Sequence, residues 1–192
     1  MSVSERRHYE ILNQDPEYRQ CRALWQERFK DIRNVFFDGK VLRNAYCPDC
    51  CYCCGPQIGC DPFPMALLDS QLSERTEEDF YLMDAHTASL DERGCKSITP
   101  HGCRLDNSQR PVACNLFPFV LIDMHLYLYE CCPAAMFLPR EDLVRLGKDV
   151  ASYLASLPLS DAERISIHMP DDYLERDYLD LHTDIAACFK GQ

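Results

Sequence analysis

The chain has 192 residues, of which 46% are hydrophobic and 27% are charged, as in a globular protein with a core of its own. No stretch reaches the roughly 20 apolar residues that span a bilayer, and the charged N-terminus lacks the apolar run of a secretory signal. The formal net charge of −11 disfavours binding to the phosphate backbones of nucleic acids. We therefore expect one cytoplasmic domain spanning 1–192, without membrane or nucleic-acid contacts, whose partner is another protein.

The N-terminal region, residues 1–44, is predicted to be helical. Apolar residues recur at helical spacing from Glu5 to Arg43, and Asp38-Gly39 breaks the pattern. Cys21 lies on this apolar stripe, and we expect it to be a small buried hydrophobic residue rather than a ligand.

The central region, residues 45–133, holds most of the cysteines among prolines and glycines. A helix is expected from Met65 to about Met83. The apolar run from Val120 to Leu128 predicts a β-hairpin whose turn lies at 123–125.

The C-terminal region, residues 134–192, is predicted to form two helices. The first spans Asp142–Leu157. The second follows a capping box formed by Ser160 and Glu163, and its apolar face includes Tyr178. Cys188 lies beside that face and is expected in the core. The fold class predicted is thus α-rich with a small β-hairpin: a loop-rich cysteine-cluster centre packed between N- and C-terminal helices.

The thirteen cysteines indicate metal chemistry. In a reducing compartment disulfides are rare, and an odd number of thiols cannot pair completely. Five of the thirteen fall within Cys47–Cys54, a spacing at which neighbouring cysteines rarely reach good disulfide geometry. We therefore expect thiolate ligands rather than disulfides.

The first cysteine run allows two kinds of metal site. Cys47, Cys50 and Cys53 form C-x2-C-x2-C, which can supply three thiolates to a 4Fe–4S cubane whose fourth ligand comes from elsewhere. The pairs Cys50–Cys53 and Cys51–Cys54 are each C-x2-C chelates, the usual half of a tetrahedral zinc site.

A second group of cysteines follows later in the chain. Cys95 and Cys103 each come after a glycine, which lets the backbone approach a cluster closely. Cys114 lies in the segment Arg110–Pro118, RPVACNLFP, and Cys132 is followed by Pro133.

These motifs resemble the YkgJ-like cysteine-cluster family, described as zinc- or iron-chelating domains of the CxxCxxCC type. The family pattern is a C-x2-C-G-x-C-C run, one or two cysteines near glycines, R-P-x-x-C-x-x-F-P and a late C-P. The match covers Ala45–Pro133, and Cys51 stands at the family's glycine position. Cys60 and Cys131 match nothing in the pattern. The resemblance implies metal chelation, and the eight matching cysteines are the ligands we expect: Cys47, Cys50, Cys53, Cys54, Cys95, Cys103, Cys114 and Cys132.

The function we expect first is binding of an iron–sulfur cluster, 4Fe–4S, in one or two sites, with a redox or cluster-dependent role. Zinc is the alternative, in a structural module that binds a protein partner. A distant similarity to flagellin lysine N-methylase implies a third reading, an iron–sulfur-dependent protein methyltransferase-like enzyme. No catalytic residue is identified, and the nearby histidines, His86, His101 and His125, are minor candidates as ligands.

Overall fold

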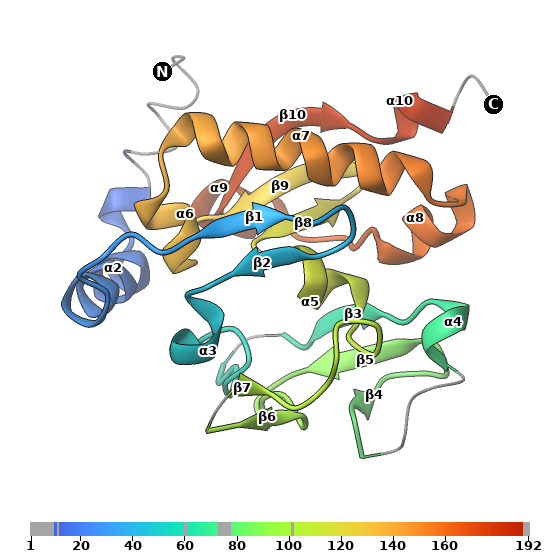
Figure 1. Ribbon diagram of the computed structural model, residues 1–192, viewed down its shortest axis with the longest axis horizontal. Helices are drawn as coiled ribbons and strands as arrows, with labels where there is room; N and C mark the ends of the chain where they lie inside the picture. Colours follow the sequence, from blue (N-terminus) through green and yellow to red (C-terminus); the bar gives the residue numbers. More distant parts are fainter. Residues whose placement is uncertain (1–9, 11, 60, 73–77, 101, 190–192) are drawn as a thin grey trace.

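The computed structural model describes residues 10, 12–59, 61–72, 78–100 and 102–189 (Figure 1). Helices hold 41% and strands 22% of these residues, and the strands form four small sheets. The fold is therefore mixed α/β, and the prediction of an α-rich fold with a single hairpin is wrong.

The sheets are all antiparallel. Two have three strands, in the orders β10-β9-β8 and β3-β5-β4, and two are hairpins, β1-β2 and β6-β7. The strands are β1 (Val35–Phe37), β2 (Leu42–Asn44), β3 (Phe63–Ala66), β4 (Tyr81–Leu82), β5 (Thr87–Leu90), β6 (Ile98–Thr99), β7 (Gly102–Cys103), β8 (Phe119–Ile122), β9 (His125–Tyr129) and β10 (Tyr178–Asp184).

Two longer helices frame these sheets, and the others are short. The helices are α2 (Pro16–Arg28), α3 (Cys47–Cys50), α4 (Asp69–Leu72), α5 (Val112–Leu116), α6 (Pro133–Phe137), α7 (Arg140–Ser156), α8 (Leu159–Ile165), α9 (Asp171–Asp177) and α10 (Ala186–Phe189). No helix of the described residues is long and apolar enough to cross a membrane.

The main core lies between α7 and the sheet β10-β9-β8. Helix α7 runs across this sheet in Figure 1 and buries Leu146, Val150 and Leu154 against it. At Gly147 a Cβ atom would lie 2.9 Å from a Leu181 side-chain atom and 3.3 Å from the Phe119 ring. Glycine at this position therefore lets helix and sheet approach closely.

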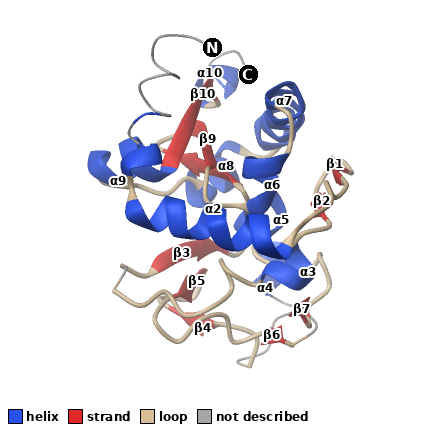
Figure 2. Ribbon diagram, turned by 90° about the vertical axis from the view of Figure 1, so that its left-hand side faces the viewer, coloured by secondary structure: helices blue, strands red, loops and turns tan. Residues whose placement is uncertain are grey.

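Helix α2 covers one side of the core. Figure 2 shows it between the sheet β10-β9-β8 and the sheet β3-β5-β4. Asp15 caps its N-terminus by accepting a hydrogen bond from the Tyr18 backbone N–H at 2.8 Å. Trp25 is its most buried aromatic residue, 1% exposed.

The N-terminal helix is much shorter than predicted. It ends at Arg28, and the apolar residues after it belong to the hairpin β1-β2, in which Val35 pairs with Asn44. The alternation of buried Val35 with exposed Phe36 is a strand pattern that the longer helical stripe concealed.

The predicted helix Met65–Met83 is also wrong. Its first residues form β3, which pairs with β5, and its last form β4. A short apolar run fits a buried strand as well as a buried helix, and here the pairing with β5 decides for the strand.

The final helix predicted around Tyr178 is in fact strand β10. It pairs with β9, Tyr178 opposite Tyr129, and so satisfies the backbone groups at an edge of β9 that would otherwise be free. The capping box is wrong as well, because α8 begins at Leu159 with Pro158 at its N-cap and no side-chain cap.

Two predicted elements are confirmed. The hairpin β8-β9 turns at Asp123 and Met124, both with positive φ, as a two-residue type I′ connection requires. Helix α7 coincides with the predicted helix Asp142–Leu157 to within two residues.

Candidate metal centre

The first cysteine run forms one short helix followed by a turn. Pro48 stands in the first turn of α3, and the helix ends at Cys51, whose φ of 53° and ψ of 12° are left-handed. The Cys51 thiol turns back toward the carbonyl oxygens of Cys47 and Pro48, at 3.9 and 3.7 Å. Cys51 thus ends the helix, and its thiol lies against the backbone of the same turn.

The second cysteine group meets this run through backbone contacts. The Cys95 N–H donates to the Cys54 carbonyl at 2.8 Å. Gly94, with φ of +74°, allows this approach, since a Cβ there would lie 3.0 Å from backbone atoms of both Gly55 and Pro56. Strand β7 packs on α3, where a Cβ on Gly102 would lie 3.7 Å from the Pro48 Cα.

Cys132 lies close enough to three thiols of the first run for its charge to raise their pKa values. Cys47 is exposed at the surface, but desolvation by the atoms around its thiol raises its pKa well above the usual range, and the charge of Cys132 adds to the effect. Burial likewise raises the pKa of Cys50 to about 12, with Cys132 again contributing. The pKa of Cys53 is raised first by its hydrogen bond with Cys54, and Cys132 also acts on it. We call Cys47, Cys50, Cys53 and Cys132 the first thiol set.

The other four cysteines of the family pattern are connected in the same way. Cys114 is exposed at the surface, but desolvation by the atoms around its thiol raises its pKa well above the usual range, and the charges of Cys54, Cys95 and Cys103 raise it further. The pKa of Cys95 is raised by burial and then by Cys54 and Cys103. We call Cys54, Cys95, Cys103 and Cys114 the second thiol set.

Cys54 lies between the two sets, because its charge also acts on Cys47 and Cys50. The hydrogen bond from Cys53 lowers the pKa of Cys54 to about 7. We assign Cys54 to the second set because its carbonyl accepts the hydrogen bond from the Cys95 N–H and because the first set already has four thiols.

Arg110 is a cation whose charge acts on thiols of both sets. It lowers the pKa of Cys47, Cys54 and Cys114. Its Nε donates to the Leu105 carbonyl at 2.9 Å, and its own carbonyl accepts from Gln71. The guanidinium group is therefore fixed where it offsets part of the negative charge of the thiolates.

The thiols do not converge on a preformed site. A cavity of about 30 Å³ lies among Tyr46, Phe117 and the cysteines of the first run, with Cys132 also in its wall. Within the described parts of the chain, no three His, Cys, Asp or Glu side chains are placed so that they could hold a metal ion as they stand. The thiol sets fit a thiophilic metal by their chemistry, but the side chains would have to turn inward to bind it.

The remaining cysteines and histidines lie outside the two sets. The twelve cysteines among the described residues are all free, and Cys188 is exposed on α10, so the expectation that it lies in the core is wrong. His86 and His125 are exposed, and Cys60 and His101 lie outside the described residues.

Two features of the site escaped the sequence analysis. The Asn44 Nδ2 donates to the Cys132 sulfur at 3.8 Å, and backbone N–H groups of Ala134 and Ala135 also favour that thiolate, whose pKa burial nevertheless raises to about 11. The side chain of Cys131 lowers the pKa of Cys21 to about 7, against the effect of burial. Neither contact has a local sequence signal, because each joins segments distant in the chain.

Comparison with models of protein families, with curated proteins and with solved structures gives no match to this chain. The resemblance to the YkgJ-like proteins therefore rests on the motif residues alone.

Proposed function

We propose that this protein binds metal through two sets of four cysteines, and that the first set holds a 4Fe–4S cluster. The observation that carries the proposal is that cysteines from distant segments of the chain gather closely enough for their charges to raise one another's pKa values. Gathering four thiols closely together raises the free energy of their charged forms, and a bound cation removes that cost.

The first set would supply Cys47, Cys50 and Cys53 from one loop, with Cys132 as the remote fourth ligand. This is the C-x2-C-x2-C arrangement that cubane clusters use, completed by a distant cysteine before a proline. The donors to Cys132, Asn44 and the start of α6, are of the kind that tunes a cluster through hydrogen bonds to sulfur. A bound cluster would supply one-electron chemistry, and these residues would position it and set its environment.

A single zinc ion in each set is the second candidate. The cavity of about 30 Å³ beside the first set is closer in size to one ion than to a cubane. Two tetrahedral zinc sites would then cross-link α3, β7 and α6, as in structural zinc modules.

We place the protein in the cytoplasm, with another protein as its partner. Support for a reducing compartment comes from the twelve free cysteines of the described residues.

The test is anaerobic purification followed by elemental analysis for iron and zinc and by assay of acid-labile sulfide. Iron with equal sulfide supports the cluster, zinc without sulfide supports the second candidate, and absence of both metals overturns the proposal. Single and double Cys→Ser variants test the two sets. Cys53→Ser should lower metal content, and adding Cys132→Ser should lower it little further, whereas adding Cys114→Ser should empty the second set as well. Cys188→Ser is the matched control and should keep the full metal content.

A further inference from the structure

A methionine of strand β3 contacts a cysteine of the second thiol set. The Cys114 thiol lies 3.4 Å from the Met65 thioether sulfur and donates to it. The contact joins α5 to β3, two elements that pack against each other. Two sulfur atoms that each bind one ion at about 2.3 Å lie no more than about 4.6 Å apart. The Met65 and Cys114 sulfurs can therefore both reach the same ion.

Packing in the sheet β3-β5-β4 holds Met65 in place. Met65 pairs with Ala88 of β5 and is 4% exposed. Its side chain belongs to an apolar cluster that also contains Leu105. Cys103, another member of the second thiol set, packs against this cluster. The fold thus brings one thioether and two thiols of the set into the same part of the molecule.

We propose that the second thiol set holds a monovalent copper ion, Cu(I), and that Met65 is a ligand to it beside Cys114 and Cys103. This inference rests on the function proposed above, in which the second set binds metal, and it identifies which metal that set selects.

The thioether is the group that favours copper over the other two metals. Zinc sites take cysteine, histidine and carboxylate ligands, and iron–sulfur clusters take cysteine and histidine. Methionine sulfur is a soft, uncharged donor that occurs as a ligand in copper sites. A neutral ligand also suits a monovalent ion, because one positive charge offsets only one thiolate and each further thiolate adds repulsion.

A substitution that removes only the sulfur tests the role of Met65. Leucine nearly conserves the volume of methionine, so Met65→Leu should keep the packing of the apolar cluster. The metal-free full-length protein is loaded anaerobically with one equivalent of Cu(I), and its affinity is measured by competition with the chelator bathocuproine disulfonate. We expect Met65→Leu to weaken Cu(I) binding at least roughly tenfold, a loss that is seen even for residues that only support ligands. Zinc binding should be unchanged.

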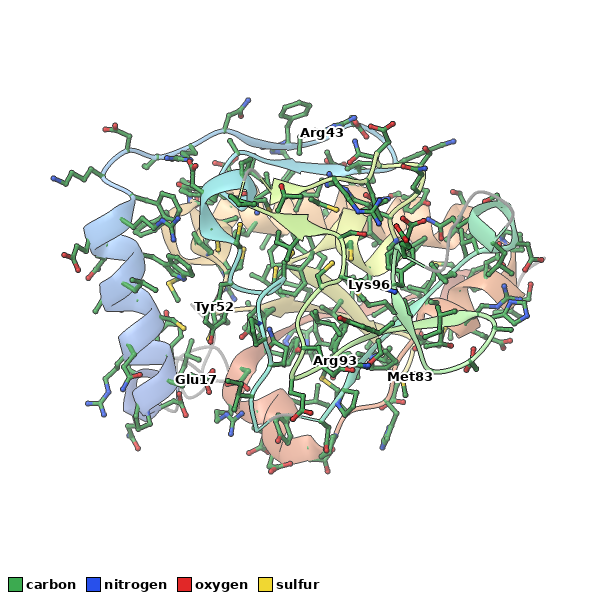
Figure 3. All side chains as sticks on the ribbon, turned by 90° about the horizontal axis from the view of Figure 1, so that it is seen from below. Glu17, Arg43, Tyr52, Met83, Arg93 and Lys96 are labelled. Atoms are coloured by element: carbon green, nitrogen blue, oxygen red, sulfur yellow. The ribbon has the colours of Figure 1, made fainter. Side chains whose placement is uncertain are left out.

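Met83→Leu is the matched control. Met83, labelled in Figure 3, follows β4 of the same sheet and is 56% exposed. This variant should bind Cu(I) as tightly as the unsubstituted protein. Equal affinity of Met65→Leu and Met83→Leu for Cu(I) overturns the inference.

A second measurement does not depend on a substitution in the core. The protein is prepared with selenomethionine at its six methionines and loaded with one equivalent of Cu(I). Its X-ray absorption spectrum at the copper edge should then show a selenium neighbour. Met65→Leu should remove this signal, and Met83→Leu should keep it. Copper with sulfur neighbours alone overturns the assignment of Met65 as a ligand.

Cys114→Ser separates this inference from the proposed function. If this variant keeps its full content of every metal, the second thiol set does not bind metal and both proposals fail. If Cys114→Ser loses metal while Met65→Leu binds Cu(I) as tightly as before, the thiol set stands and only the selection of copper by Met65 is wrong.

Discussion

Trp25 and Cys131 are joined by a buried hydrogen bond, from the indole Nε1 to the carbonyl oxygen at 3.0 Å. It fastens α2 to the segment that carries Cys132, a member of the first thiol set, and the Trp25 ring also meets the Tyr52 ring edge-on. Trp25→Phe keeps a ring against Phe29 but leaves the buried carbonyl without its donor.

We expect Trp25→Phe to lower the free energy of unfolding by about 1–3 kcal/mol, the cost of an unsatisfied buried group. Urea denaturation of the purified protein measures it. Leu24→Ala is the control on the same helix, since Leu24 is 46% exposed, and it should change stability by no more than about 0.5 kcal/mol. Equal losses in the two variants would show that the hydrogen bond contributes nothing specific.

Gly94→Ala tests whether the close approach of the two cysteine groups matters for metal binding. A Cβ at this position would lie 3.0 Å from two backbone atoms, which cannot yield as a flexible side chain can. Metal content should fall, with the greater loss in the second thiol set.

The matched control is Gly39→Ala, in the turn between β1 and β2. Gly39 also has positive φ, +96°, but nothing lies within 4 Å of the added Cβ. In both variants an alanine with left-handed φ lowers stability by roughly 1–2 kcal/mol. Only Gly94→Ala also brings the added Cβ into a steric clash. Full metal content in Gly94→Ala would mean that the contact between the groups is not needed.

Metal removal should loosen one part of the molecule before the other. Hydrogen exchange measured with and without a chelator should show lost protection in 47–56, 91–100 and 102–103, which carry six of the eight proposed ligands, and retained protection in α7 and β8-β9-β10. Uniform protection under both conditions would argue against metal-dependent folding.

Acid should have the same effect as the chelator. Burial raises the pKa of Cys50 to about 12 and that of Cys132 to about 11, so in the metal-free protein both thiols are protonated at neutral pH. The metal must displace these protons, and its apparent affinity falls about tenfold per pH unit for each proton displaced. Titration of metal release from pH 8 downward measures this slope, and a flat profile would contradict ligation by these thiols.

Cys51→Gly should retain full metal content and leave stability unchanged or raise it by up to about 1 kcal/mol. The left-handed φ at position 51 destabilises the folded protein with cysteine but not with glycine. This gain offsets the stability lost because glycine is more flexible in the unfolded chain. Elemental analysis and urea denaturation of the variant provide the check. A loss of metal would make Cys51 a ligand.

Local patterns predicted the parts of this protein that local residues determine. The hairpin β8-β9 was predictable because apolar strands flank a two-residue turn at Asp123-Met124. Helix α7 was predictable because Leu146, Val150 and Leu154 recur on one face. Strand β10 was not, since Tyr178 and Leu181 also fit a helical period and only the free edge of β9 selects the extended form.

The candidate site was likewise predictable only where neighbouring residues determine it. Spacing alone groups Cys47, Cys50 and Cys53, because residues in one short loop must lie close together. It leaves Cys114 and Cys132 equally eligible as the fourth partner. In the folded chain the charge of Cys132 acts on Cys47, whereas Cys114 is affected by Cys54 of the first run and by Cys95.

The left-handed turn at Cys51 has an evolutionary consequence. Every cysteine codon becomes a glycine codon by one base change, and the backbone at this position is one that glycine adopts without strain. A thiol could therefore be gained or lost here in a single mutational step, while the helix end that orients Cys47 and Cys50 is preserved. Position 51 offers a place where the chain can vary its number of thiols without rebuilding the loop.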